Sequence, residues 1–337
     1  MTSHIVLLLV CLVGIYASFL TWGVLQEQIS SQVFGKEEER FSAPFVINLA
    51  QNVAGFIVGW VYVVYQNSQV SEEQRVSAFD LSLLKSVTLV ALTQSLSSPI
   101  GLSSVQHVDY LLYQLAKSCK LIPVMLIHLT VYRAKFPFYK YAVAGSVTLG
   151  VMLFSIAGSS KSSKNSSNEG GNLTWGLILL CTSLLLDGIT NAEQDSMFKK
   201  NTKLTGAHLQ CALNFVSFGF TLFYASVMTN QLQYAIDFIS RYPSILREIA
   251  LYAVCGAIGQ IFIFVTLANF GSIVLITVTV TRKMMSMLLS VVIFGHDLQM
   301  GQWIALGLVF GGIGYEAWVK LQQSKKTKQV AIDKKEK

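Results

Sequence analysis

Apolar stretches of about 20 residues recur along nearly the whole chain, and this recurrence constrains the fold more than any other feature. About 20 apolar residues in a helix are enough to cross the hydrocarbon core of a bilayer. Hydrophobic residues make up 53% of the 337 residues and charged residues only 13%, which excludes a soluble globule of ordinary composition. The sequence therefore predicts an all-α polytopic membrane protein.

The apolar pattern predicts ten transmembrane helices. They are expected at residues 5–25, 44–66, 80–100, 105–132, 139–158, 173–195, 206–229, 246–267, 270–294 and 301–320. The first begins too close to Met1 to leave a basic segment before it, and other spans follow. We therefore interpret it as a retained span, with a cleaved signal peptide as the alternative.

Lysine and arginine lie mainly in the connections on one side of this layout, which places both termini in the cytosol. The net charge of +7 comes largely from the C-terminal tail, so it indicates membrane orientation rather than a nucleic-acid partner. The connection 159–172 then faces the lumen, and it carries two N-glycosylation acceptor patterns, at Asn165 and Asn172.

The chain ends in Lys334-Lys335-Glu336-Lys337. This ending resembles the dilysine signal by which coat-protein machinery returns membrane proteins to the endoplasmic reticulum. A solvated basic tail is the alternative interpretation. If the signal is used, the protein is a multi-pass component of the endoplasmic reticulum membrane, with the tail in the cytosol.

An internal repeat becomes visible when the sequence is shifted by 162 residues. The shift places Gly145 and Gly150 on Gly307 and Gly312, and it places Lys120 on Arg282. Five spans is an odd number, so a duplicated five-span unit enters the membrane in the opposite orientation. We expect a first five-helix repeat (1–158), a lumenal linker loop (159–172), a second repeat (173–320) and a cytosolic basic tail (321–337).

Two cationic pairs lie inside apolar segments, Lys117 with Lys120 and Arg282 with Lys283. A charge at bilayer depth costs roughly 2.5–3.5 kcal/mol, so each needs a function or a partner. On one helix, Lys117 and Lys120 would share a face. Inverted repeats bind substrates near the midplane between their halves, and cations from both halves would suit the phosphates of a multiply charged anion. One of the four cations could instead pair with an acid.

Further candidate substrate-binding residues are polar or aromatic groups near these cations. Tyr113 and Gln114 lie one turn before Lys117, with Tyr113 able to stack on a base. Asp187 and Asn191 form a polar stripe in the span 173–195, and Glu27 follows the first span; the list is therefore Tyr113, Gln114, Asp187, Asn191 and Glu27. Glu27 would close the site or neutralise a lysine. For Asp187, Asn191 and Glu27, an ordinary solvated helix end is the alternative.

The usual enzyme signatures are absent from the sequence. There is no GxxxxGK[ST], HExxH or GxSxG motif, and the five cysteines and five histidines show no metal-ligand spacing. We therefore expect no catalytic activity, cofactor or metal.

Four segments carry a resemblance to a known family: Trp22-Gly-Val-Leu-Gln-Glu27, Lys117-Ser-Cys-Lys-Leu-Ile-Pro-Val-Met125, Asp187-Gly-Ile-Thr-Asn191 and Thr279-Val-Thr-Arg-Lys283. They resemble the B subfamily of the solute carrier 35 nucleotide-sugar transporters, most closely its fungal endoplasmic-reticulum members. The resemblance implies a drug/metabolite transporter fold of ten helices in two inverted halves. It also implies substrate phosphates at Lys117, Lys120, Arg282 and Lys283. Val280 departs from the threonine expected there, which puts a hydroxyl contact in doubt.

The resulting hypothesis is an antiporter that moves UDP-galactose and/or UDP-glucose from the cytosol into the endoplasmic reticulum in exchange for UMP. Such transport would support lumenal glycosylation and protein folding. One alternative keeps the fold and exchanges ATP for ADP. Another, of a different class, is a non-transporting membrane component of lumenal folding homeostasis.

Overall fold

The computed structural model describes residues 2–35, 38–69, 81–119, 121–130, 136–165, 173–200, 205–295 and 298–333. Its helices are α1 (Thr2–Ser31), α2 (Pro44–Ser68), α3 (Leu81–Ser103), α4 (Tyr110–Ser118), α5 (Leu121–Thr130), α6 (Phe138–Asn165), α7 (Leu173–Lys200), α8 (Gly206–Phe223), α9 (Gln231–Arg241), α10 (Ser244–Phe294) and α11 (Met300–Asp333). A 3₁₀ turn at Ser104–Gln106, a π-helical turn at Tyr224–Met228 and a hairpin of β1 (Val33–Phe34) and β2 (Glu39–Arg40) complete the described elements. The predicted all-α class is confirmed.

Seven helical segments of the described chain are long and apolar enough to cross a membrane. They are Ile5–Ser31, Pro44–Ser68, Phe138–Ala157, Leu173–Gln194, Gly206–Met228, Ser244–Phe270 and Thr277–Phe294. They coincide with seven of the ten expected spans, so the chain is a multi-pass membrane protein. The other three expected spans are helical as well, but α3 and α11 are less apolar and the third is divided between α4 and α5.

Helix α10 is continuous in its backbone assignment but folds back on itself. Glu248 accepts a hydrogen bond from Gln28, and Ser290 donates one to the neighbouring residue Glu27. In a straight helix Glu248 and Ser290 would lie about 60 Å apart, at 1.5 Å per residue. The helix therefore turns back between Phe262, which lies against Gly14, and Thr281, which is hydrogen-bonded to Tyr16, and both of its arms lie against α1. The expected separation into two spans is retained, although the helical assignment is not interrupted.

The expected span 105–132 is not one helix. Its first helix, α4, ends at Ser118, where the amide of Cys119 turns back to the carbonyl of Ala116. Pro123 contributes to the break, because it has no N–H with which to continue the helical ladder to the Cys119 carbonyl. The prediction that Lys117 and Lys120 share a face of a continuous helix is therefore wrong. Lys120 itself lies outside the described residues.

Two helices extend beyond the membrane boundaries expected from the sequence. Helix α6 continues to Asn165, so the predicted linker loop 159–172 is helical in its first half. Helix α11 continues to Asp333 through most of the predicted tail 321–337. Hydropathy marks where a helix leaves the bilayer, whereas lysine and glutamine in the α11 extension are good helix formers in water.

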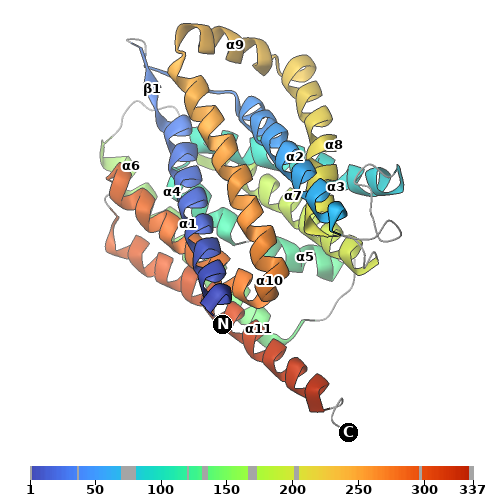
Figure 1. Cartoon of the computed structure of the whole chain (residues 1–337). Coiled ribbons are helices and arrows are strands. Elements are labelled where there is room, and N and C mark those ends of the chain that lie inside the picture. Colours follow the sequence, from blue (N-terminus) through green and yellow to red (C-terminus); the bar gives the residue numbers. More distant parts are fainter. Residues whose placement is uncertain are drawn as a thin grey trace.

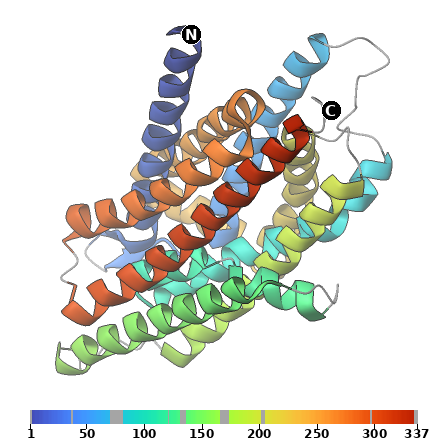
Figure 2. The same ribbon diagram turned by 90° about the horizontal axis from the view of Figure 1, so that it is seen from below.

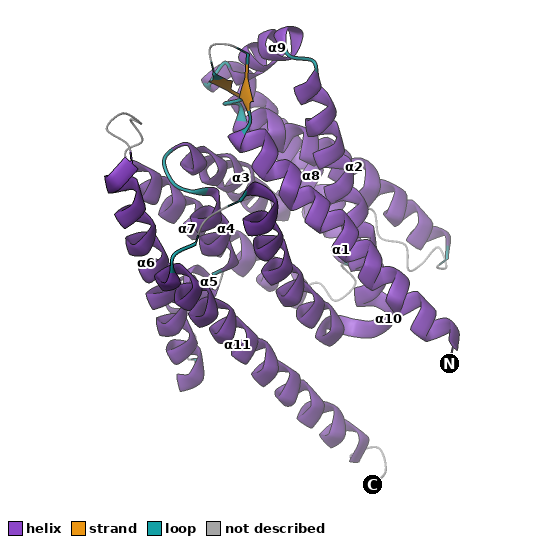
Figure 3. Cartoon of the chain, turned by 90° about the vertical axis from the view of Figure 1, so that its left-hand side faces the viewer, coloured by secondary structure: helices purple, strands orange, loops and turns teal. Residues whose placement is uncertain are grey.

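A small cap covers one end of the helical bundle (Figures 1 and 3). It consists of α9 and the β1–β2 hairpin, joined by packed rings of Phe34, Phe41, Tyr234, Phe238 and Tyr242. An exposed ion pair of 2.9 Å between Arg241 and Glu39 links α9 to β2, and this hydrogen bond raises the pKa of the guanidinium. The start of α1 and the end of α11 lie at the opposite end of the bundle (Figure 1).

The bundle is assembled from pairs of helices that are distant in sequence. Helix α1 packs along α10, α2 along α8, α3 along α7 and α6 along α11. Figure 2 shows the last pair, with α6 in green beside α11 in red. The α6–α11 interface is part of a core that includes Val143, Val147, Phe154, Ala305 and Val309. Each pair joins the first half of the chain to the second.

We expect Gly188→Ala to destabilise the protein, because α7 and α5 touch at this glycine. An added Cβ would lie 2.9 Å from the backbone of Pro123, so the main chain of one of the two helices would have to shift. Overpacking costs about 1–3 kcal/mol, more than the roughly 1 kcal/mol that alanine gains in helix propensity. The midpoint of thermal unfolding in detergent measures the effect. Gly219→Ala, which meets open space on α8, is the control and should be neutral or stabilising.

Candidate functional site

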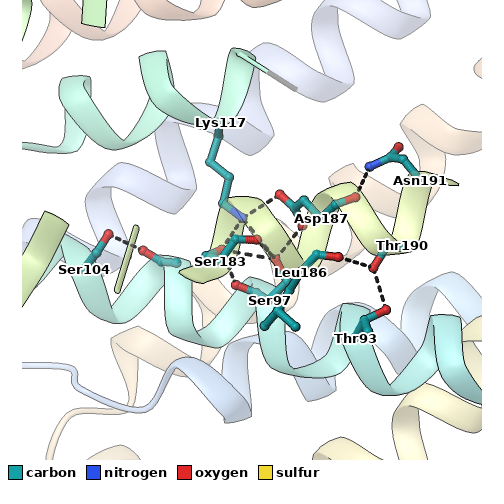
Figure 4. Close-up of polar contacts among 10 residues, drawn as sticks. Thr93, Ser97, Ser104, Lys117, Ser183, Leu186, Asp187, Thr190 and Asn191 are labelled. Atoms are coloured by element: carbon teal, nitrogen blue, oxygen red, sulfur yellow. Dashed lines mark hydrogen bonds and ion pairs between the residues drawn. The ribbon is translucent and has the colours of Figure 1, made fainter. Parts of the chain in front are cut away.

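A partly buried ion pair between Lys117 of α4 and Asp187 of α7 lies at the centre of the candidate site (Figure 4). The Lys117 Nζ atom lies 2.8 Å from Asp187 Oδ2, and each side chain keeps about a fifth of its exposure, 18% and 20%. The same ammonium donates to Ser183 Oγ at 2.5 Å and to Ser97 Oγ at 3.3 Å. Lys117 is thus held by one charged and two neutral oxygens from α3 and α7.

Hydroxyl groups hold α3 and α7 together around this ion pair. Ser97 donates to Asp187 Oδ1 at 2.5 Å, and Ser183 donates to the Ser97 carbonyl at 2.6 Å. Thr190 lies two turns after Ser183 on α7, and its hydroxyl shares a hydrogen bond of 2.7 Å with that of Thr93 on α3. Both serines are buried. This seam fixes the position of the Asp187 carboxylate.

A glycine on α3 makes room for the lysine side chain. A Cβ at Gly101 would lie 2.8 Å from Lys117 Cε and 2.6 Å from Ser183 Oγ. Any larger residue at this position would displace the lysine or the serine. The position of the Lys117 side chain against α3 therefore depends on Gly101.

Helices α4 and α10 meet one turn away from the ion pair. Gln114 Nε2 donates to Ser286 Oγ at 3.1 Å, and Gly23 of α1 lies against the same hydroxyl, where a Cβ would be only 2.6 Å away. Lys117 lies three residues after Gln114, and Arg282 lies four residues before Ser286. The hydrogen bond thus places one cation from each of two helices within a helical turn of a single crossing point.

Arg282 has a different environment from Lys117. Its guanidinium carbon lies 4.4 Å from the centre of the Phe19 ring, a cation–π contact. No carboxylate within the described residues forms an ion pair with it. The adjacent Thr281 shares a hydrogen bond of 2.5 Å with Tyr16, which ties this turn of α10 to α1. Lys283 is half-buried and close enough to act electrostatically on the Cys119 thiol.

Tyrosines and an acid line the region between α4 and α1. Tyr113 is buried, with its ring 5.7 Å from that of Tyr110, and it lies within electrostatic range of Asp187. Glu27 is 1% exposed and accepts a hydrogen bond from Ser290 of α10. Helix α1 continues to Ser31, so Glu27 lies within the bundle and not at a solvated helix end.

The structure brings together most, but not all, of the residues predicted from the sequence. Asp187 pairs with Lys117, and Tyr113 and Gln114 lie about one turn before Lys117 on α4. Asn191 instead turns back and donates to the carbonyl of Asp187 at 2.5 Å (Figure 4). Asn165 is the last residue of α6, and Lys120, Asn172, Lys334 and Lys335 lie outside the described residues.

Three serines of the site were not identified from the sequence: Ser97, Ser183 and Ser290. Each lies in an apolar segment, where a serine most often packs helices together. The only sequence signal was polarity inside a predicted span, and many other serines and threonines of this chain share it.

Comparison with known proteins identifies the family. The UAA transporter family model matches residues 7–320. A protein of Debaryomyces hansenii called UDP-galactose transporter homolog 1 is 48% identical over 341 residues, covering 96% of this chain and 96% of its own. Proteins of the same name from Yarrowia lipolytica and Saccharomyces cerevisiae are 48% and 41% identical, over 96% and 92% of this chain and 89% and 94% of their own. The chain therefore belongs to the UAA transporter family, which confirms the predicted family and the prediction of a transporter rather than an enzyme.

Proposed function

We propose that this protein is a nucleotide-sugar antiporter of the endoplasmic reticulum membrane. It would carry UDP-galactose and/or UDP-glucose into the lumen in exchange for UMP, and so support lumenal glycosylation and protein folding. The observation that carries the proposal is that Lys117 of α4 and Arg282 of α10 each lie within about one helical turn of the Gln114–Ser286 hydrogen bond. The names of the fungal relatives support UDP-galactose as cargo.

The proposed binding mode assigns the diphosphate to the two cations. Arginine supplies a planar fork that matches two phosphate oxygens, and lysine supplies a compact charge. Lys120 and Lys283 extend the positive region in this proposal. Gln114 Oε1 is buried and accepts no hydrogen bond from the described residues, so it is left for a donor on the ligand. Tyr113 offers a ring face to the base.

We further propose that the chain is built from ten membrane helices in two inverted halves, residues 1–158 and 173–320. Reciprocal contacts between α6 and α11 support this arrangement. Gly150 lies against Val309 and Gly312 lies against Val147, and the 162-residue shift exchanges these two contacts. Ser146 donates to the carbonyl of Leu308, and Leu308 is the residue onto which the 162-residue shift places Ser146. Contacts that exchange in this way are typical of a twofold axis.

Two features of the sequence complete the proposal. The dilysine pair Lys334-Lys335 would be read by coat-protein retrieval machinery from the cytosol, where both termini would lie. Asn165 and Asn172 would then be lumenal glycosylation candidates. The start of α1 and the end of α11 lie at the same end of the bundle, which supports a common side for the termini (Figure 1).

Counterflow into liposomes tests the function. Purified protein is reconstituted, the vesicles are preloaded with UMP or ADP, and labelled UDP-galactose, UDP-glucose and ATP are offered outside. We expect uptake of a UDP-sugar that depends on internal UMP. ATP uptake driven by ADP would instead identify an energy exchanger that uses the same site. Silence in every combination, from protein shown to be folded, would favour a non-transporting role.

A further inference from the structure

The ammonium group of Lys117 has no donor to spare in this structure. An ammonium carries three N–H donors, and Lys117 Nζ lies within hydrogen-bond distance of three oxygens: Asp187 Oδ2, Ser183 Oγ and Ser97 Oγ. A phosphate oxygen that binds Lys117 must therefore replace one of these partners.

The partner that a phosphate replaces most readily is the carboxylate. Asp187 and a phosphate are both anions, so holding both on one lysine brings like charges together in a poorly hydrated site. Ser97 and Ser183 are neutral, and neither repels a second oxygen. A phosphate can keep both serines as neighbours, but it competes directly with Asp187.

The carboxylate has a place to remain when the lysine leaves it. Its second oxygen, Oδ1, accepts a hydrogen bond of 2.5 Å from Ser97, which does not depend on Lys117. The hydroxyl seam of α3 and α7 keeps Asp187 close to where the lysine was. Asp187 is thus positioned to take the lysine back once the anion has gone.

We propose that Asp187 is a resident counter-ion, which holds Lys117 while the site is empty and is displaced from it by the substrate phosphate. This proposal rests on the proposed function, and it assigns Asp187 a positioning role instead of a contact with substrate. Competition by Asp187 weakens the binding of the phosphate and accelerates its release. An exchanger must release one ligand before it can carry the next, so fast release favours exchange.

The two cations of the site then have different roles. Arg282 forms no ion pair with the described carboxylates and lies on the Phe19 ring, so its charge is available to attract an anion. Before a ligand binds, the carboxylate of Asp187 already neutralises the charge of Lys117. A ligand would reach Arg282 without breaking an ion pair to a described carboxylate, whereas its bond to Lys117 requires the Lys117–Asp187 ion pair to open.

Asp187→Asn provides the test, because it removes the charge and keeps the shape. We expect the dissociation constant of UMP to fall about tenfold, and the maximal rate of UMP exchange to fall with it. Uridine, which has no phosphate, should show no change in affinity. Binding is measured by ligand-dependent thermal shift of the purified full-length protein, and exchange is measured in liposomes.

Thr190→Val is the matched control, because it removes a hydrogen bond between the same two helices without touching Lys117. It should alter thermal stability. The dissociation constant of UMP and the maximal rate of UMP exchange should both stay as in the wild type. A purely structural ion pair would behave differently, since Asp187→Asn would then lower stability and UMP affinity together. That result, or an unchanged affinity, would overturn the proposal.

If Asp187→Asn does not fold, Ser97→Ala tests the same idea without a change of charge. It removes the hydrogen bond that the carboxylate keeps once the lysine has left it, so displacing Asp187 costs more and we expect weaker UMP binding, with the affinity for uridine unchanged. An unchanged UMP affinity, or an equal loss of affinity for UMP and uridine, would count against the counter-ion. Wild-type protein that neither binds nor exchanges UMP would instead reject the proposed function itself.

Discussion

Arg282→Gln is expected to reduce UDP-sugar exchange by about a hundredfold or more. A hydrogen bond to a charged group contributes about 1.5–3 kcal/mol, and an arginine fork makes two of them to a phosphate. A loss of about 3 kcal/mol corresponds to roughly two powers of ten in affinity. The folded protein should persist, because Arg282 has no ion pair with the described residues whose loss would strand a buried acid. The initial rate of counterflow at low substrate concentration measures the change.

Two further variants make this result specific. Arg282→Lys keeps the charge but loses the fork, so we expect an intermediate rate. Arg241→Gln makes the same chemical change at an exposed ion pair of the cap, far from the site residues in sequence, and it should leave exchange as in the wild type. Wild-type rates in Arg282→Gln would remove Arg282 from the phosphate site.

The membrane class and most helix positions could be predicted because the bilayer imposes its thickness on the sequence. Apolar windows of the required length marked seven segments that the structure also shows as long apolar helices. The same signal could not find the ends of α6 and α11, because a helix that has left the bilayer is limited by its own propensities and caps. Nor could it show that α10 turns back without a helical interruption.

At the break between α4 and α5, the length of the apolar run favoured one helix over the local signal of Pro123, and that prediction was wrong. Pro123 lies in the middle of an apolar run of membrane-spanning length, and length favoured one uninterrupted helix. A proline is compatible with the first turn of a new helix, where its missing N–H costs nothing. The sequence is compatible with one continuous helix or with two shorter ones. The backbone turn at Cys119 shows that two helices form.

The charged residues of the site were predictable, but their partners were not. Lys117 and Asp187 were identified because charge at bilayer depth is costly wherever it occurs. Their pairing depends on how α3, α4 and α7 pack, and it joins residues 70 positions apart. The serines around them resemble any serine that packs helices, so no local pattern separates Ser97 or Ser183 from the rest.

Lys117→Met is expected to give the largest loss of stability among single substitutions at the site. It leaves the Asp187 carboxylate without its cation among apolar helices, and breaking a buried pair in this way costs about 3–5 kcal/mol. We expect a value near 3 kcal/mol, at the low end of that range, because Asp187 keeps about a fifth of its exposure and its hydrogen bond from Ser97. The midpoint of thermal unfolding in detergent, without ligand, measures the loss.

The double variant Lys117→Met/Asp187→Asn separates this structural effect from transport. Removing both charges leaves no unpaired ion, and the asparagine oxygen still accepts from Ser97, so most of the lost stability should return. Exchange should not return, because the phosphate has lost Lys117 whatever stands at position 187. A double variant as unstable as Lys117→Met would show that the lysine stabilises the bundle through its packing and not by neutralising Asp187. A double variant that regains exchange would show that the phosphate does not need Lys117.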